Sequence, residues 1–213
     1  MRVYYLTAAT FGLSNLALRR LKVSRFSELN DPFELLAVDS ANPDLREAVQ
    51  ARKGDVDGNE GLVCFSRGWR NPLLWSHYGE KHRGMCLGFD VPDANLTKVI
   101  YRGGLRKIAQ HEIEDKIRLL QRTKFRGWSY EQEERMFVDL RGMKPQSGLF
   151  FIPFSTNLAL REVILGPKCE LPISEIRELA RIFEPPVFVV GTRIAYTKFA
   201  VVEDRTLRGT DRK

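Results

Sequence analysis

The sequence lacks the patterns that mark several familiar enzyme classes. It contains no GxGxxG, GxxxxGK(S/T), HExxH or GxSxG pattern. These patterns place, respectively, a dinucleotide, a nucleoside triphosphate, a catalytic zinc ion and a catalytic serine. The sequence therefore offers no basis for a Rossmann-type, P-loop, zinc-protease or serine-hydrolase mechanism.

Cysteine and histidine are scarce, with three of each. Cys64, Cys86 and Cys169 lie in apolar, strand-like stretches without CxxC spacing, which favours reduced, buried thiols over a disulfide framework. The histidines show no ligand spacing with these cysteines, although His77 and His82 lie close enough to share a site. No metal site is predicted.

Long apolar runs are also missing. No segment approaches the roughly 18 apolar residues of a membrane span, and the first residues show no signal-peptide pattern. With 43% hydrophobic and 29% charged residues, the composition is that of a globular protein. We expect a cytoplasmic protein with no membrane partner. Its 213 residues predict a single domain over 1–204 and a basic tail over 205–213, with no prediction of the oligomeric state.

Apolar runs at 61–66 and 84–90 have strand length and predict central strands. The pattern predicts helices at 8–20, 44–53, 104–122 and 173–183, a short helix after Pro32, a loop at 54–59, and further strands at 2–6, 97–101, 133–139, 148–153, 162–165, 187–191 and 199–203. Helices and strands mix without a regular βαβ rhythm. This favours an α+β fold with a mixed, largely antiparallel central sheet flanked by helices.

Positive charge exceeds negative charge by seven, from 34 basic and 27 acidic residues. Part of this excess lies in 101–126, which predicts a nucleic acid or another polyanion as a partner. A solvated helix face explains the same charges. The basic residues of this segment are Arg102, Arg106, Lys107, Lys116, Arg118, Arg122, Lys124 and Arg126.

The densest group of functional residue types is Trp75, Ser76, His77 and Tyr78, followed by His82. Between two apolar strands, these side chains could line a pocket that offers stacking surface, hydrogen-bond donors and a group that titrates near neutral pH. His77 is a candidate acid or base, and the others are candidates for substrate binding. The alternative is core packing, because Trp75 and Tyr78 are three positions apart on a short helix.

A second group is Glu131, Glu133 and Arg135. If this segment is extended from 131 to 138, alternation places all three side chains on one face. The arginine would then lower the pKa of the carboxyl groups and hold an oriented, ionised carboxylate against a developing positive charge. The alternative is a surface strand with a cross-strand ion pair.

A third feature is Asn30-Asp31-Pro32-Phe33-Glu34, whose residue types suit a turn for local reasons. Six motifs follow one another along the chain: Asn30 to Glu34, Cys64-Phe65-Ser66, Leu74 to Tyr78, His82-Arg83-Gly84, Tyr130-Glu131-x-Glu133-x-Arg135 and Val163 to Gly166. Their order resembles the bacterial domain-of-unknown-function family 2971 over nearly the whole chain. The resemblance implies an intracellular bacterial protein of a family sometimes associated with phage-defence or toxin-like settings. Glu134 departs from the tryptophan frequent in that family.

The chain also distantly resembles the ADP-ribosyltransferase fold, in which a first strand, a central aromatic segment and a later Glu-x-Glu strand surround NAD. Tyr5, the segment from Trp75 to Tyr78, and Glu131-x-Glu133 would take those places in the same order. Asn30, Asp31 and Arg135 are further candidates for binding the substrate.

The resemblance implies NAD as the substrate and Glu133 as the carboxylate that stabilises an oxocarbenium-like transition state. Glu131 would activate the acceptor, and Tyr78 or Trp75 would stack on nicotinamide. One departure is that the first strand carries no arginine or histidine beyond Arg2. The alternative function is a non-catalytic module that binds nucleic acid or another polyanion through 101–126.

Overall fold

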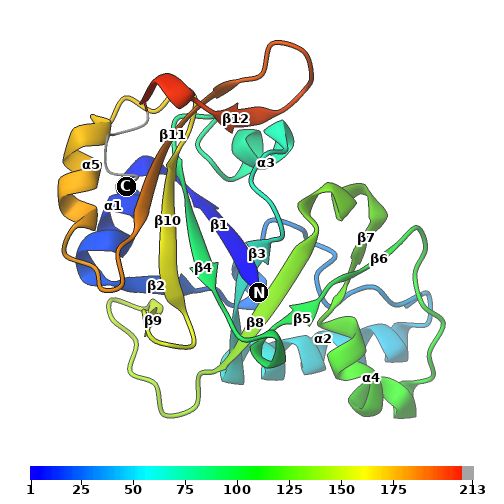
Figure 1. Cartoon of the computed structure of the whole chain (residues 1–213). Helices are drawn as coiled ribbons and strands as arrows, with labels where there is room; N and C mark the ends of the chain where they lie inside the picture. The colour runs from blue at the N-terminus through cyan, green and yellow to red at the C-terminus, as the bar shows by residue number, and fades with distance from the viewer. Residues whose placement is uncertain (208–213) are drawn as a thin grey trace. The chain divides into compact units, whose positions relative to one another are not determined.

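The computed structural model describes residues 1–207, which divide into two units (Figure 1). Unit 1 comprises Met1–Leu21, Phe65–Asp93 and the chain from Pro153 onward, and unit 2 comprises Lys22–Cys64 and Ala94–Ile152. Strand β3 (Glu60–Ser66) runs from one unit into the other. The single domain over 1–204 stays a prediction. The expected basic tail lies outside the described residues from position 208 onward.

Unit 1 contains a mixed sheet in the order β12-β11-β10-β4-β1. Strand β4 lies antiparallel to both β1 and β10, β11 runs parallel to β10, and β12 closes the sheet as the antiparallel partner of β11. The predicted α+β class with a mostly antiparallel sheet is therefore confirmed. The strands are β1 (Arg2–Thr7), β4 (Met85–Asp90), β10 (Ala159–Leu165), β11 (Phe188–Ile194) and β12 (Val201–Glu203).

The middle strand of this sheet, β4, is buried along most of its length, as its continuous apolar sequence predicts. Trp75 and Cys86 have no exposed surface and pack with Ile164 in the core. A Cβ atom added at Gly12 would lie 2.1 Å from Met85 Sδ, so the missing side chain lets α1 approach β4. The helices of unit 1 are α1 (Ala9–Leu18), α3 (Pro72–His77) and α5 (Ile173–Ala180).

The longest helix of unit 2 is α2 (Pro43–Asn59), with 17 residues. The Asn42 side chain caps it by accepting from Asp44 N at 2.8 Å. The predicted helix over 44–53 is part of α2, but the predicted loop over 54–59 is wrong, because the helix continues to Asn59. Val56 is buried in the same cluster as Val49, and this packing outweighs the low helix propensity of the two glycines that follow Lys53.

Two other helix predictions in unit 2 are wrong. Helix α4 (Ile113–Leu120) is shorter than the predicted 104–122, because Arg106 is extended and exchanges backbone hydrogen bonds of 2.8 Å with Ala37 and Asp39. No helix follows Pro32, where the chain forms turns and Leu35 has a positive φ of 63°.

The remaining elements of unit 2 are short. Strands β6 and β7 pair in parallel, and β8 lies beside β3 and pairs antiparallel with β5. In residues 1–207 no helix is both long enough and apolar enough to cross a bilayer. The strands not yet given are β2 (Arg20–Val23), β5 (Thr97–Lys98), β6 (Ile100–Arg102), β7 (Thr123–Phe125), β8 (Glu133–Asp139) and β9 (Phe150–Pro153). The 3-10 helices are η1 (Phe26–Glu28), η2 (Asp93–Asn95), η3 (Gln110–Glu112), η4 (Arg126–Glu131) and η5 (Arg205–Leu207).

Candidate functional site

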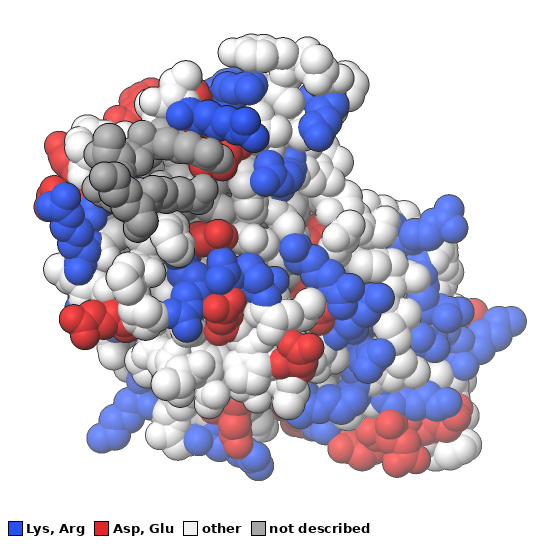
Figure 2. All heavy atoms as spheres, viewed as in Figure 1, with Lys and Arg blue, Asp and Glu red and all other residues white. Residues whose placement is uncertain are grey.

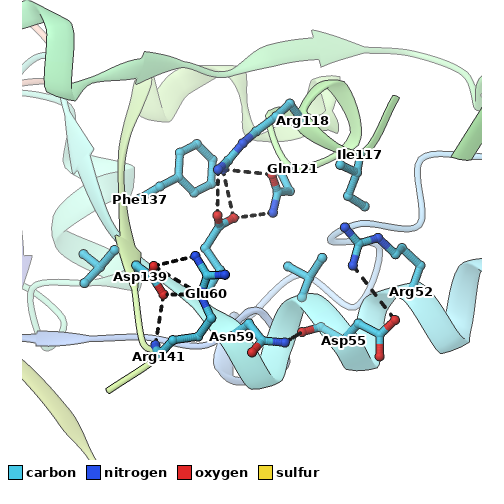
Figure 3. Close-up of a pocket in the computed structure, with 12 residues that line it drawn as sticks. Arg52, Asp55, Asn59, Glu60, Ile117, Arg118, Gln121, Phe137, Asp139 and Arg141 are labelled. Carbon is cyan, nitrogen blue, oxygen red and sulfur yellow. Dashed lines mark hydrogen bonds and ion pairs between the residues drawn. The ribbon is translucent and has the colours of Figure 1, made fainter. Parts of the chain in front are cut away.

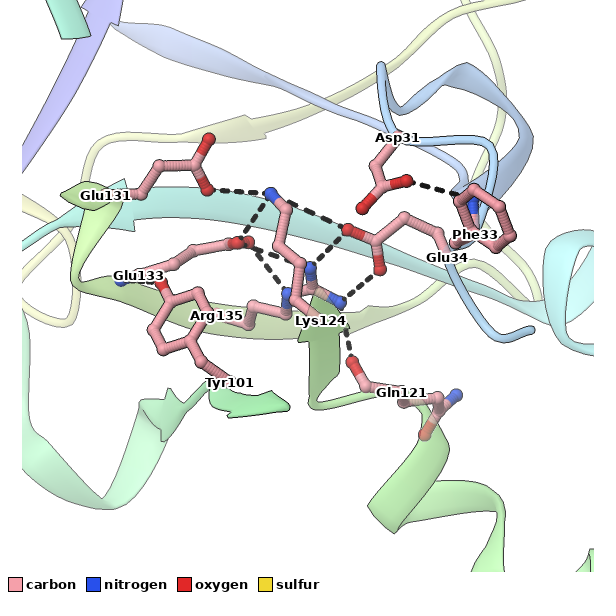
Figure 4. A network of polar contacts seen from close by, with 9 residues as sticks. All are labelled: Asp31, Phe33, Glu34, Tyr101, Gln121, Lys124, Glu131, Glu133 and Arg135. Atoms are coloured by element: carbon pink, nitrogen blue, oxygen red, sulfur yellow. Dashed lines mark hydrogen bonds and ion pairs between the residues drawn. The ribbon is translucent and has the colours of Figure 1, made fainter. Parts of the chain in front are cut away.

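A buried network of charged side chains lies in unit 2, with Arg135 of β8 at its centre (Figure 4). The Arg135 side chain has no exposed surface. Its two terminal nitrogens donate to the two oxygens of Glu34 at 2.6 and 2.9 Å, and its Nε donates to Glu133 Oε1 at 2.7 Å. A further bond of 2.6 Å goes to the carbonyl of Gln121. This forked geometry fixes both carboxylates in orientation.

Lys124 of β7 is the second cation of the network (Figure 4). Its Nζ lies 2.7 Å from Glu131, 3.0 Å from Glu133 and 3.7 Å from Glu34. It also lies 5.1 Å from the centre of the Trp128 ring. Two cations and three carboxylates are thus enclosed together, and each cation has more than one partner.

The electrostatics of the network keep Glu133 ionised. Burial alone would raise its pKa, but the charges of Arg135 and Lys124 outweigh burial and lower it to about 2. Burial likewise opposes the charge of Lys124, yet the surrounding carboxylates raise its pKa. The neighbouring Cys64 thiol has a pKa raised by burial and then by the charge of Glu133, so it stays protonated rather than nucleophilic.

The sequence correctly groups Glu131, Glu133 and Arg135, but the predicted geometry is wrong in two respects. Glu131 ends the helix η4, and Gln132 has a positive φ of 46°, so strand alternation begins only at Glu133. The group shares no solvent-exposed surface, and the alternative of a surface strand is wrong as well, because Glu133 is only 3% exposed. The turn at Gln132 and the charge of Lys124 bring the two glutamates together.

Asp31 is buried and accepts from the backbone of Phe33 at 2.9 Å, and it lies beside Glu34 in Figure 4. Asn30, the other candidate from this turn, is exposed. Sequence reasoning missed Glu34 and Lys124 as members of the network. The presence of Glu34 in the same motif as Asp31 was the available signal, whereas nothing in the sequence distinguishes Lys124 from its basic neighbours.

The Trp75–Tyr78 segment lies on and after α3 in unit 1. Trp75 is fully buried, and its indole nitrogen donates to the carbonyl of Trp69 at 2.5 Å, so its ring offers no face to a ligand. Tyr78 is half-buried and has its ring centroid 6.2 Å from that of the exposed His77. Tyr5 of β1 contacts Phe65 edge to face at 6.3 Å. Of these aromatic candidates, Trp75 belongs to the core.

The structure brings Ser76 and His82 together, with 3.2 Å between Oγ and Nε2. The intervening turn is strained, because Glu80, Lys81 and His82 all have positive φ, at 50°, 53° and 74°. Burial, and then the charge of Lys168, lower the pKa of His82. Within residues 1–207 its Nδ1 is buried without a hydrogen-bond partner, so no third group orients the ring as in a catalytic triad.

A pocket of about 470 Å³ in unit 2 is lined mainly by α2, α4 and β8 (Figure 3). Each of the three arginines that line it forms an ion pair with an acidic side chain. Arg118 lies 2.7 Å from Glu60, and Arg141 lies 2.7 Å from Asp139. Arg52 lies 2.8 Å from Glu114, which does not line the pocket. The pocket is therefore polar and charge-balanced, and it provides no free cation for a phosphate.

The predicted basic segment 101–126 divides into paired and unpaired cations. Lys116 lies 2.9 Å from Glu112, Arg118 is paired with Glu60, and Lys124 is enclosed in the network. The five others form no ion pair with any residue from 1 to 207: Arg102, Arg106, Lys107, Arg122 and Arg126.

Three of these unpaired cations lie on or near the β6–β7 pair, and we call them, together with the exposed Phe125, the arginine patch: Arg102, Arg106, Phe125 and Arg126. Arg102 is the register partner of Phe125 across β6 and β7, and Phe125 is 57% exposed. Arg106 has a buried Nε without a partner in the described chain, and burial followed by the charge of Arg102 lowers its pKa. Figure 2 shows Lys and Arg side chains over the β6–β7 region.

No group of three or more metal-binding side chains is arranged to hold a metal ion in the described part of the chain. No protein-family model matches the sequence, and no curated protein or solved structure matches it either. The resemblance to family 2971 therefore stays a prediction based on the motifs. Two of these motifs, around Asp31 to Glu34 and Glu131 to Arg135, contribute to one buried network.

Proposed function

We propose that the protein binds a phosphate-rich polyanion, in the first place a nucleic acid, through the arginine patch. The observation that supports this proposal is that Arg102, Arg106 and Arg126 have no carboxylate partner within residues 1–207. Guanidinium groups suit phosphate because their planar donors can bind two of its oxygens at once. The exposed ring of Phe125, the register partner of Arg102, adds an apolar surface beside them.

The buried network of Arg135 contrasts with this patch. There, every cation already has at least two carboxylate partners at short distance. In the patch, Arg102 and Arg106 lie close enough for one charge to affect the other, and no acidic side chain compensates them in the described residues. A bound phosphate would offset this repulsion. Phosphate binding is therefore more favourable at the patch than at the network, whose cations already have carboxylate partners.

The test is binding of a fluorescently labelled DNA duplex of about 20 base pairs at increasing salt concentration, followed by anisotropy. We expect Arg102→Glu to weaken binding by about tenfold or more and to reduce the salt slope by about one. Lys116→Glu changes the net charge equally, but its ammonium is already paired with Glu112, so a change below about twofold is expected.

Equal losses in both variants would show that net charge alone governs binding and would contradict a site at the patch. Binding that does not respond to salt, or no binding at all, would remove the proposal. Circular dichroism of Arg102→Glu must match the wild type, which its exposed position favours.

NAD glycosyl transfer is a second candidate, because Arg135 and Lys124 hold the Glu133 carboxylate ionised and oriented. Such a carboxylate can stabilise an oxocarbenium-like centre. Tyr78 is then the better stacking candidate, since Trp75 has no exposed face. The 3% exposure of Glu133 means that this candidate also requires the network to open toward the substrate.

Nicotinamide release from NAD by the purified wild type, followed by NMR, tests this candidate. Activity in the wild type that disappears in a folded Glu133→Gln variant would support it. No release by the wild type would remove it, whatever the variant does. A variant that unfolds would assign Glu133 a structural role, and Tyr78→Ala would then serve as the second probe.

A further inference from the structure

The hairpin formed by β11 and β12 in unit 1 presents two aromatic side chains to solvent. The tip is closed by a hydrogen bond of 2.9 Å from Ala195 N to Ala200 O. Phe199 is 99% exposed and Tyr196 is 88% exposed. Exposed apolar surface that is gathered in one place, as at this tip, is typical of interaction sites. Neither residue belongs to the motifs discussed above.

Beside this tip lies a pocket of about 590 Å³, which we call the hairpin pocket. Arg193 stacks over the Tyr196 ring, with 4.4 Å from Cζ to the ring centroid. Arg70 stacks over Trp69 at the same distance, and its carbonyl accepts from Val201 N at 2.9 Å, which ties it to the hairpin. The charged residues that line the pocket are Arg70, Arg193, Lys198, Glu203, Asp204 and Arg205.

The cations of the hairpin pocket outnumber its acids by four to two. None of the four basic side chains forms an ion pair with any part of the chain that the structure describes. The Asp204 Oδ1 atom accepts from Thr206 N at 3.0 Å and from the Thr206 hydroxyl at 2.7 Å. These hydrogen bonds, and then the charge of Arg193, lower the pKa of Asp204. Figure 2 shows Lys and Arg side chains gathered near this hairpin, at the top of the view.

We propose that the hairpin pocket binds single-stranded nucleic acid. Bases stack on Tyr196 and Phe199, and the basic side chains of the pocket contact the phosphates. Single-strand binding sites combine exposed aromatic rings with unpaired cations. The rings stack on the flat faces of the bases, and the cations bind the charged phosphates of the backbone. A volume near 590 Å³ falls within the range of small-molecule sites, so a nucleotide unit fits.

The concave shape favours this occupant over a lipid surface. A membrane would contact the tip through Tyr196 and Phe199, but its flat surface would leave the hollow beside Arg70 and Arg193 unused. A nucleic-acid strand uses both the rings and the hollow. The proposal goes beyond the arginine patch, because the residues differ and lie in the other unit.

The experiment is anisotropy of a labelled oligodeoxythymidine of about ten nucleotides with the full chain. We expect the double variant Tyr196→Ala/Phe199→Ala to bind at least about tenfold more weakly. Tyr196→Phe keeps the ring and should stay within about twofold of the wild type. Phe11→Ala is the matched control, because it removes another exposed ring of unit 1, at 67% exposure, and should change nothing.

The outcomes separate this proposal from the arginine patch. Binding of the duplex should weaken by about tenfold or more in Arg102→Glu and stay unchanged in the hairpin double variant. If the double variant Tyr196→Ala/Phe199→Ala binds the single strand as well as the wild type does, the proposal is wrong and the patch accounts for all binding. If the double variant no longer sediments with phosphatidylserine vesicles but still binds the oligonucleotide, the surface is a membrane site and the proposal is likewise overturned.

Discussion

Arg135 forms two hydrogen bonds, of 2.6 and 2.9 Å, with the carboxylate of Glu34, from which it is separated by 101 positions. The pair joins the turn that follows Asp31 to strand β8. Because both side chains are buried, neither charge can be solvated by water if its partner is removed. The Arg135–Glu34 contact therefore fixes the position of this turn against β8 and also contributes to the stability of unit 2.

Arg135→Met should lower the free energy of unfolding by about 3–5 kcal/mol, because Glu34 and Glu133 would stay buried with only Lys124 as a partner. Urea unfolding at neutral pH measures this loss. Arg181→Met is the control. Its guanidinium is exposed and pairs with Glu178 at the surface, so a change within about 0.5 kcal/mol is expected. Similar values for the two variants would show that the buried network adds little stability.

The lowered pKa of Glu133 predicts that the stability of the protein depends on pH in a specific way. Its pKa of about 2 in the folded chain lies below the unfolded value near 4.3. The stabilisation is therefore complete above about pH 4.3 and is lost as the pH falls toward 2. The difference in unfolding free energy between wild type and Glu133→Gln should shrink by about 3 kcal/mol over that window. A difference that does not vary with pH would contradict the ionised state of Glu133.

Asp139 provides the comparison for this experiment. Hydrogen bonds from Arg141 also lower its pKa to about 2, but both side chains are exposed. Solvent and salt screen such a pair. The effect of Asp139→Asn should therefore vanish at about 1 M salt, whereas that of Glu133→Gln should remain.

Two glycines should respond in opposite directions to alanine. A Cβ atom at Gly84 would lie 2.1 Å from the carbonyl oxygen of Thr7, so Gly84→Ala should destabilise by about 2–3 kcal/mol. Gly54 lies inside α2 and has no atom within 4 Å of the added position. Gly54→Ala should stabilise by about 0.5–1 kcal/mol. Thermal unfolding of both variants checks the signs, and destabilisation by Gly54→Ala would place the end of α2 in doubt.

The fold was predictable where the local pattern and the tertiary contacts agree. The strand expected at 133–139 coincides with β8, and the run at 84–90 is the buried β4. The predictions are wrong where contacts between residues distant in sequence determine the secondary structure. Val56 keeps α2 helical through a glycine-rich stretch, and Ala37 and Asp39 hold Arg106 extended in a segment with helical spacing.

The candidate site was predictable only in part. Neighbours in sequence, such as Glu133 and Arg135, could be grouped from alternation. The burial of these charges depends on Glu34 and Lys124, which reach them from other segments. The exposed rings of Tyr196 and Phe199 resemble ordinary strand residues in the sequence, and only their place at a hairpin tip distinguishes them.

The division of the chain means that the segments of the two units are completed at different times during synthesis. Unit 1 begins at Met1 and needs the segment from Pro153 onward, whereas unit 2 is complete when the ribosome has added Ile152. Strand β4 is synthesised well before β10, its other neighbour in the sheet, which begins only at residue 159. All residues of unit 2 can thus be present while strand β4 of unit 1 still lacks its partner β10 and has an unpaired edge. That edge is the surface for which a chaperone would compete.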